Sequence, residues 1–179
     1  MKKYVILLIV GVYVGLIGTI GAQETITSKK ASVKFDGGKN IEAENSTSKF
    51  IIRDSDDSIV SLITIKDFIF PNSLMQEHFN ENYMESDKYP EASFSGKLTG
   101  FNKDEITTEK KSFEAVGKMT IHGVTKKIKL PVSIYVNSNG EMELQSTFKI
   151  ALEDYKIKIP KIMFVKIAEV ADVNIVCWF

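Results

Sequence analysis

The chain has 179 residues with 23 basic and 23 acidic side chains, so its formal net charge at pH 7 is zero. A chain without excess positive charge lacks the electrostatic surface that nucleic acid binding requires, and its single cysteine, Cys177, excludes an intrachain disulfide. We therefore expect one domain that is held together by its hydrophobic core.

The N-terminal segment has the order of a secretory signal peptide. Two lysines precede an almost entirely apolar run at residues 4–20, and small residues up to Ala22 follow it. An uncleaved membrane anchor is the alternative, because the apolar run is nearly long enough to span a bilayer. We predict that residues 1–22 are a cleaved signal peptide, which leaves no stable membrane span. Residues 23–179 then form one periplasmic or secreted domain with 21 basic and 23 acidic residues and a formal charge of −2.

Most of the remaining chain alternates apolar and polar residues with the period of two that is typical of strands buried on one face. Alternating or strand-like runs occupy residues 31–36, 40–45, 48–52, 92–98, 111–121, 127–136 and 141–150. Residues 58–70 are apolar on both faces, and residues 166–179 end the chain as a long strand. Turn sequences such as Asn139-Gly140 separate the runs. The spacing predicts an all-β, antiparallel sandwich or barrel of about eight strands.

One segment between two predicted strands has a helical period. Met75, Phe79 and Tyr83 recur four residues apart, and Ser73 is followed three residues later by a glutamine, as in a capping box. We predict one short amphipathic helix over about 73–83.

His78 on this helix is the most prominent candidate for chemistry, because Glu77 and Glu81 lie close to it in the sequence. A zinc site needs more ligands than one helix turn offers here, and the other histidine, His122, falls in a predicted hairpin turn. We interpret His78 and its glutamates as a solvated helix face, with a metal or proton-transfer site and a polar ligand contact as alternatives. The chain has no nucleophile elbow, phosphate loop or dinucleotide fingerprint, so we predict no catalytic residue, metal or cofactor.

The inward faces of the predicted strands form the candidate ligand-binding surface. An eight-stranded barrel has an interior just wide enough for side chains or for one ligand. The apolar stripes fit a solid core or a lipid cavity, and periodicity alone favours the solid core. If a ligand binds, the candidate contacts are the inward apolar residues Phe94, Leu98, Phe113, Met119, Ile121, Leu130, Ile134 and Phe148.

Residues 117–132, GKMTIHGVTKKIKLPV, resemble the signature of the YceI-like, polyisoprenoid-binding periplasmic family. In that signature a glycine leads to an apolar residue, Thr, an apolar residue, a basic residue, Gly-Val-Thr and an alternating strand. Residues 89–96, YPEASFSG, are similar to the family's Pro-x-Ala-x-Phe strand start. The resemblance covers about 73–179. It implies an eight-stranded, lipocalin-like antiparallel barrel whose apolar tunnel binds, transports or stores a long isoprenoid chain without catalysis.

The N-terminal part departs from the family pattern. Typical members begin the mature chain with a Tyr, an Asp and a His-Ser pair, whereas residues 29–50 contain no His or Tyr. Head-group contacts made by that region in relatives are therefore not transferred to this chain. The implied partner is an isoprenoid or another long-chain lipid. The alternative is a non-enzymatic envelope or stress protein with a filled core that acts through a protein partner, and the sequence leaves a homodimer open.

Overall fold

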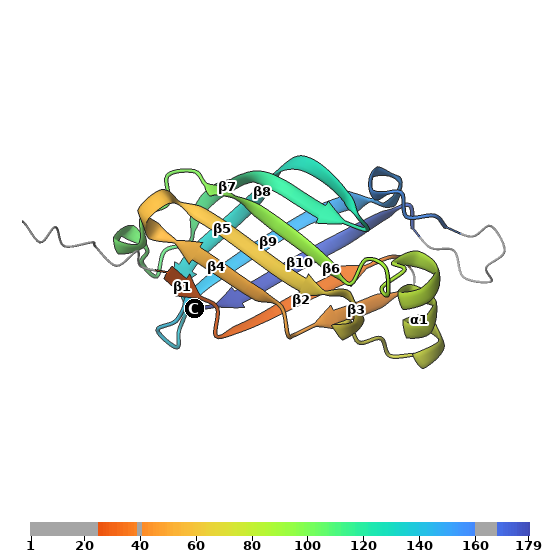
Figure 1. Ribbon diagram of the computed structural model, residues 1–179. Helices are drawn as coiled ribbons and strands as arrows, with labels where there is room; N and C mark the ends of the chain where they lie inside the picture. Colours follow the sequence, from red (N-terminus) through yellow and green to blue (C-terminus); the bar gives the residue numbers. More distant parts are fainter. Residues whose placement is uncertain (1–24, 39–40, 160–167) are drawn as a thin grey trace, which may run out of the picture.

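The computed structural model describes residues 25–38, 41–159 and 168–179, so the predicted signal peptide lies outside the described residues. The described residues form one antiparallel sheet in the order β1-β4-β5-β6-β7-β8-β9-β10-β2-β3 (Figure 1). Its strands are β1 (Thr25–Thr27), β2 (Lys30–Asp36), β3 (Glu42–Asn45), β4 (Lys49–Arg53), β5 (Ser58–Thr64), β6 (Glu91–Leu98), β7 (Lys111–Ile121), β8 (Val124–Val136), β9 (Met142–Ala151) and β10 (Val170–Trp178).

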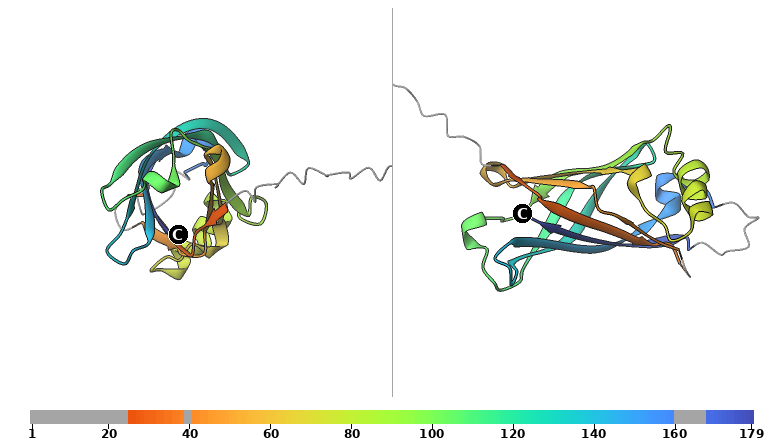
Figure 2. Two further views of the ribbon diagram at one scale, coloured as in Figure 1. Left: turned by 90° about the vertical axis from the view of Figure 1, so that its left-hand side faces the viewer. Right: turned by 90° about the horizontal axis from the view of Figure 1, so that it is seen from below.

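The sheet curls around a common interior (Figure 2). β1 and β2 lie at opposite sides of the sheet but are successive parts of one stretch of chain, so they bring the two sides together. The Ser28 N–H donates to the Phe50 carbonyl in β4 at 2.8 Å, and the adjacent Lys29 N–H donates to the Trp178 carbonyl in β10 at 2.8 Å. Two neighbouring amides thus join the two sides of the sheet. The expected count of eight strands is wrong, since the described residues contain ten. The interruption at Ser28-Lys29 divides the N-terminal strand in two, and the start of the domain was not recognised as a strand.

The wall between β8 and β9 is only partly hydrogen-bonded. The register pairs Ser133–Val136 of β8 with Met142–Gln145 of β9. The next residue of β8 on the side facing β9 is Pro131, which has no N–H to donate, and its carbonyl accepts from the Ser146 Oγ at 2.7 Å instead. The sheet is therefore a curled barrel that is not fully closed by backbone pairing toward its helix-bearing end.

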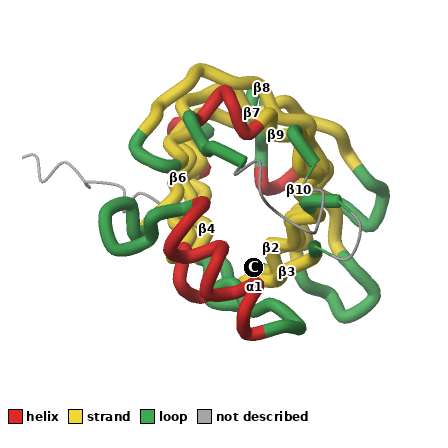
Figure 3. The backbone as a smooth tube through the Cα atoms, turned by 90° about the vertical axis from the view of Figure 1, so that its right-hand side faces the viewer, coloured by secondary structure: helices red, strands yellow, loops and turns green. Residues whose placement is uncertain are grey.

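The predicted helix is present as α1 (Ser73–His78), which continues as a π-helical turn, η3 (Phe79–Tyr83), at one end of the barrel (Figure 3). Its N-cap is Asn72, whose Oδ1 accepts from the Leu74 and Met75 N–H groups at 2.9 and 3.2 Å. The capping box expected at Ser73 is wrong, because Asn72 is an equally good cap one residue earlier. Shorter 3₁₀ helices are η1 (Asp54–Asp56), η2 (Ile65–Asp67), η4 (Lys103–Glu105) and η5 (Leu152–Tyr155).

The predicted strand faces are confirmed along β8. Leu130, Val132 and Ile134 are buried, whereas Lys127 and Lys129 are exposed. The expected strand at residues 58–70 ends earlier, because the chain turns into η2 after Thr64. Within the described ranges, no helix has the length and apolar character needed to cross a bilayer.

Two glycines allow β6 and β7 to approach closely. Gly96 pairs with Gly117 in the register, and a Cβ on Gly117 would lie 2.5 Å from the Gly96 Cα. The tip of the Phe94 ring lies over this pair, since its Cζ would be 2.7 Å from a Cβ on Gly96 and 2.8 Å from one on Gly117. Only glycine at both positions leaves this space for the Phe94 ring.

Candidate functional site

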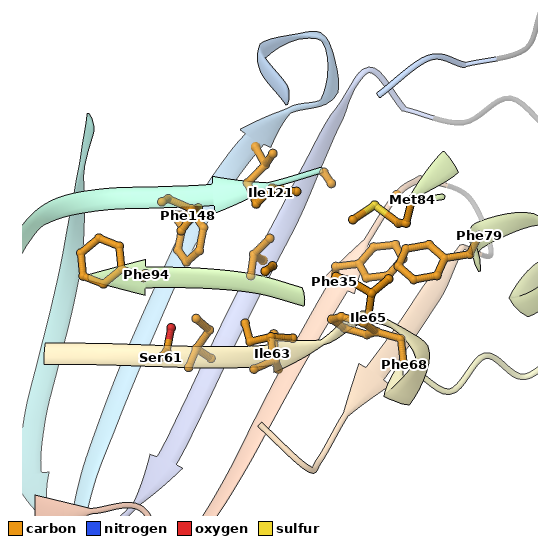
Figure 4. Close-up of a pocket in the computed structure, with 18 of the residues that line it drawn as sticks. Phe35, Ser61, Ile63, Ile65, Phe68, Phe79, Met84, Phe94, Ile121 and Phe148 are labelled. Atoms are coloured by element: carbon orange, nitrogen blue, oxygen red, sulfur yellow. The ribbon is translucent and has the colours of Figure 1, made fainter. Parts of the chain in front are cut away.

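The end of the barrel that carries α1, called here the helix end, contains a cavity of about 450 Å³ (Figure 4). Inward side chains of β2 and of β4 to β10 line it, and Met75, Phe79 and Tyr83 of the helical segment contribute to its wall. These three residues form the apolar stripe that was predicted for the helix. The stripe therefore faces the cavity and covers apolar surface that would otherwise contact water.

The opposite end, called here the solid end, is filled by side chains. Ile52, Leu98, Ile134 and Cys177 are 0% exposed and are not among the residues that line the cavity. Burial raises the pKa of the Cys177 thiol, which keeps it in the unreactive thiol form. The interior is thus solid at one end and hollow at the other, so the preference for a solid core is correct for only part of the barrel.

The eight residues predicted to contact a ligand divide between these two regions. Leu98 and Ile134 lie in the solid end, and Phe113 packs on Phe101 with the ring centroids 5.9 Å apart. The other predicted residues line the cavity: Phe94, Met119, Ile121, Leu130 and Phe148.

Four phenylalanines gather where the helical segment meets the barrel. The rings of Phe35 on β2 and Phe79 on η3 are stacked with centroids 5.3 Å apart. Phe68 and Phe70, which follow η2, contact Phe79 at 5.6 and 5.0 Å. This cluster could not be predicted from the sequence, because its members come from three separate segments. The alternation of Phe68 and Phe70 showed only that the two share a face.

The cavity wall is almost entirely apolar. Among the residues that the structure describes, no Lys, Arg, Asp or Glu side chain lines it. The Ser61 hydroxyl on β5 faces inward (Figure 4), and the Ser146 hydroxyl is bonded to the wall itself. Desolvation raises the pKa of Tyr83, which keeps its phenol neutral. A charged group inside this wall would lack a counter-ion, so the cavity suits an uncharged, apolar molecule.

His78 differs from its interpretation as part of a solvated face. Its side chain is half-buried and lines the cavity at the helix end, whereas Glu77 and Glu81 are exposed. The helical period places His78 next to Phe79 at the edge of the apolar stripe. In the described part of the chain, no three His, Cys, Asp or Glu side chains come together to hold a metal ion.

His122 connects three loops at the helix end through its side-chain contacts. Its Nε2 lies 2.8 Å from Glu85 Oε2, its Nδ1 lies 3.2 Å from the Tyr155 carbonyl oxygen, and its ring meets the Tyr89 ring edge-on at 4.5 Å. His122 is in the β7–β8 turn, Glu85 follows η3, and Tyr155 ends η5. These contacts attach the C-terminal end of the helical segment to the barrel rim. The sequence placed His122 in a turn, and its partners could not be predicted because they are distant along the chain.

Comparison with known proteins places this architecture in a family. Residues 18–179 match the YceI-like domain family. The fold is similar to a polyisoprenoid binding domain from Saccharophagus degradans, with a TM-score of 0.66, 11% identity and coverage of 88% of this chain and 94% of the other.

Two further solved structures share the fold. Burkholderia cenocepacia BcnA has a TM-score of 0.63 and 14% identity, with 84% of this chain and 95% of the other covered. A Campylobacter jejuni YCEI protein has a TM-score of 0.50 and 18% identity, with 100% and 96% covered. No curated protein matches the chain. Because the family match spans most of its length, this chain belongs to the family of proteins with a YceI-like domain.

Proposed function

We propose that this protein binds one long, uncharged, isoprenoid-like lipid inside its barrel and carries or stores it after export to the periplasm or the extracellular space. The observation that carries the proposal is the cavity of about 450 Å³, whose described lining includes no Lys, Arg, Asp or Glu side chain. The order of the N-terminal 22 residues supports export.

The relatives support a lipid as the ligand. A solved structure with this fold is a polyisoprenoid binding domain, and it resembles this chain over most of its length. The apolar wall of the cavity in this chain suits an isoprenoid chain. The alternative of a filled core that acts through a protein partner is less well supported, because only the solid end is filled.

The energetics of such binding depend on buried chain length. Each CH₂ moved from water into an apolar cavity contributes about 0.8 kcal/mol. Association costs at least about 4 kcal/mol, and micromolar affinity corresponds to about 8 kcal/mol. At least about fifteen buried carbons are therefore needed for micromolar binding, and polar atoms serve mainly to orient the lipid.

The test is mass spectrometry of an organic extract from protein purified from its native cell envelope under non-denaturing conditions. We expect the extract to contain about one apolar lipid per protein. Ala115 is buried, lines the cavity and is small, so Ala115→Phe should fill the space and reduce the bound lipid severalfold. Lys129→Glu on the outer face is the matched control and should retain the lipid. A wild-type protein that carries no lipid and takes up none from vesicles would refute the proposal.

A further inference from the structure

We propose that Phe94 sets the chain length at which the affinity for a bound lipid stops increasing. This inference rests on the proposed function, because it concerns how deep a lipid tail can enter the cavity. It assigns a specificity-determining role to one of the five predicted contacts that line the cavity.

Phe94 marks the deepest lining position on its strand. Along β6, Ala92 and Phe94 line the cavity, whereas Leu98, four residues further on the same face, is 0% exposed and lies in the solid end. Figure 4 shows Phe94 farthest from Phe79 among the labelled residues. The lining on β6 therefore ends at Phe94.

The ring of Phe94 points toward the solid end. Its tip lies over Gly96, which is one inward position deeper on β6, and over Gly117, the partner of Gly96 on β7. At this level β5 contributes Ile59, which is the partner of Gly96 and the deepest lining residue on β5. The ring thus closes the hollow region along β5 and β6, whereas the lining reaches Ala115 on β7 and Leu144 on β9.

The fully buried side chains beyond the Phe94 ring cannot make room for a longer tail. Leu98 and Ile134 have no exposed surface, and close-packed protein interiors lack space for an added chain segment. At the helix end, by contrast, Leu74 lines the cavity and is 57% exposed, so surplus chain can extend toward water there. Carbons beyond the depth set by Phe94 remain in water and add no hydrophobic stabilisation.

The experiment measures dissociation constants of delipidated full-length mature protein for geraniol, farnesol, geranylgeraniol and geranylfarnesol by displacement of a fluorescent apolar probe. Wild-type affinity should rise along the series and then level off. In Phe94→Ala the space of the ring joins the cavity, so affinity should level off at least one isoprene unit later. In wild type, the first alcohol on the plateau binds no more tightly than the alcohol before it. In Phe94→Ala, that same alcohol should bind about tenfold more tightly than the alcohol before it.

Phe148→Ala is the matched control. Phe148 also lines the cavity, but on β9 both Leu144 and Ser146 line it at deeper positions. Its truncation widens the cavity and should lower the affinity for every alcohol without moving the plateau.

The outcomes separate this inference from the proposed function. If Phe94→Ala binds the alcohols with the wild-type plateau, Phe94 does not set the length. If wild type binds none of them, the proposed function itself fails. Thermal unfolding establishes that each variant is folded, and Phe94→Leu replaces Phe94→Ala if the alanine variant is not. The smaller truncation should move the plateau in the same direction, and an unchanged plateau in Phe94→Leu would also overturn the inference.

Discussion

At the residue scale, a buried carboxylate on the outer face stabilises the solid end. Glu143 is 8% exposed and accepts hydrogen bonds from the Tyr135 hydroxyl at 2.7 Å, Gln145 Nε2 at 2.7 Å, Trp178 Nε1 at 2.9 Å and Asn137 Nδ2 at 3.2 Å. Burial alone raises the pKa of Glu143, but these hydrogen bonds together outweigh it and hold the pKa below its ordinary value of 4.5. The network joins β8, β9 and β10 through the ionised form of one side chain.

Removing one donor from this network should destabilise the protein. We expect Tyr135→Phe to lower the free energy of unfolding by about 1.5–3 kcal/mol, the range for a hydrogen bond to a charged group. Urea denaturation measures the change. Tyr83→Phe is the control, because within the described chain the buried Tyr83 hydroxyl has no hydrogen-bond partner, so its loss should not destabilise. Equal effects of the two substitutions would contradict this account.

The same network predicts a dependence on acid. The folded-state pKa of Glu143 is lowered, so its stabilising contribution is fully present above the unfolded-state pKa near 4.5. It is lost as the pH falls from that value through the folded-state pKa. Urea denaturation at a series of pH values should show this loss in wild type and a smaller loss in Tyr135→Phe. Identical pH profiles would show that Glu143 does not titrate as inferred.

At the element scale, β8 shows how alternation assigns the two faces of a strand. Ile134 is 0% exposed, whereas Lys129 is exposed and lies 3.1 Å from Glu114 of β7. A period of two is enough to assign these faces, because adjacent side chains of a strand point in opposite directions. The helical segment was predictable for a similar reason. Met75, Phe79 and Tyr83 recur every four residues and so lie on one face of a helix, and only that face packs against a partner surface.

Reversing polarity on each face of β8 should have unequal effects. Ile134→Asp places an unpaired carboxylate in the solid end and should cost about 4 kcal/mol or more, enough to unfold the domain or abolish lipid binding. Lys129→Glu breaks an exposed ion pair and should cost less than about 1 kcal/mol. Circular dichroism and urea denaturation measure both effects. A stable, lipid-binding Ile134→Asp protein would show that the faces are inverted.

At the scale of the whole molecule, the division into a solid end and a hollow end makes stability depend on the ligand. A lipid that binds only the folded barrel at about 100 times its Kd adds about 2.7 kcal/mol to the free energy of unfolding. For a domain of this size, that corresponds to an increase of about 5–10 °C in Tm. The solid end needs no ligand, so the delipidated protein should remain folded.

Thermal unfolding of delipidated protein with and without added farnesol or geranylgeraniol measures this coupling. We expect Tm to rise with lipid concentration in wild type. The increase should be much smaller in Ala115→Phe, whose larger side chain occupies the cavity. A Tm that is independent of lipid in wild type would indicate that the cavity does not take up the chain.

The all-β class, the inward residues, the helix near 73–83 and the family could be predicted from the sequence, because they depend on local alternation and on one short motif. The number of strands and the position of the hollow region could not, because they depend on contacts between strands that are distant along the chain. Phe94 and Leu98 share a strand face and an apolar character, yet one lines the cavity and the other lies in solid core. The difference depends on which side chains of distant strands meet at each depth of the barrel. Spacing along a single strand carries no information about that meeting.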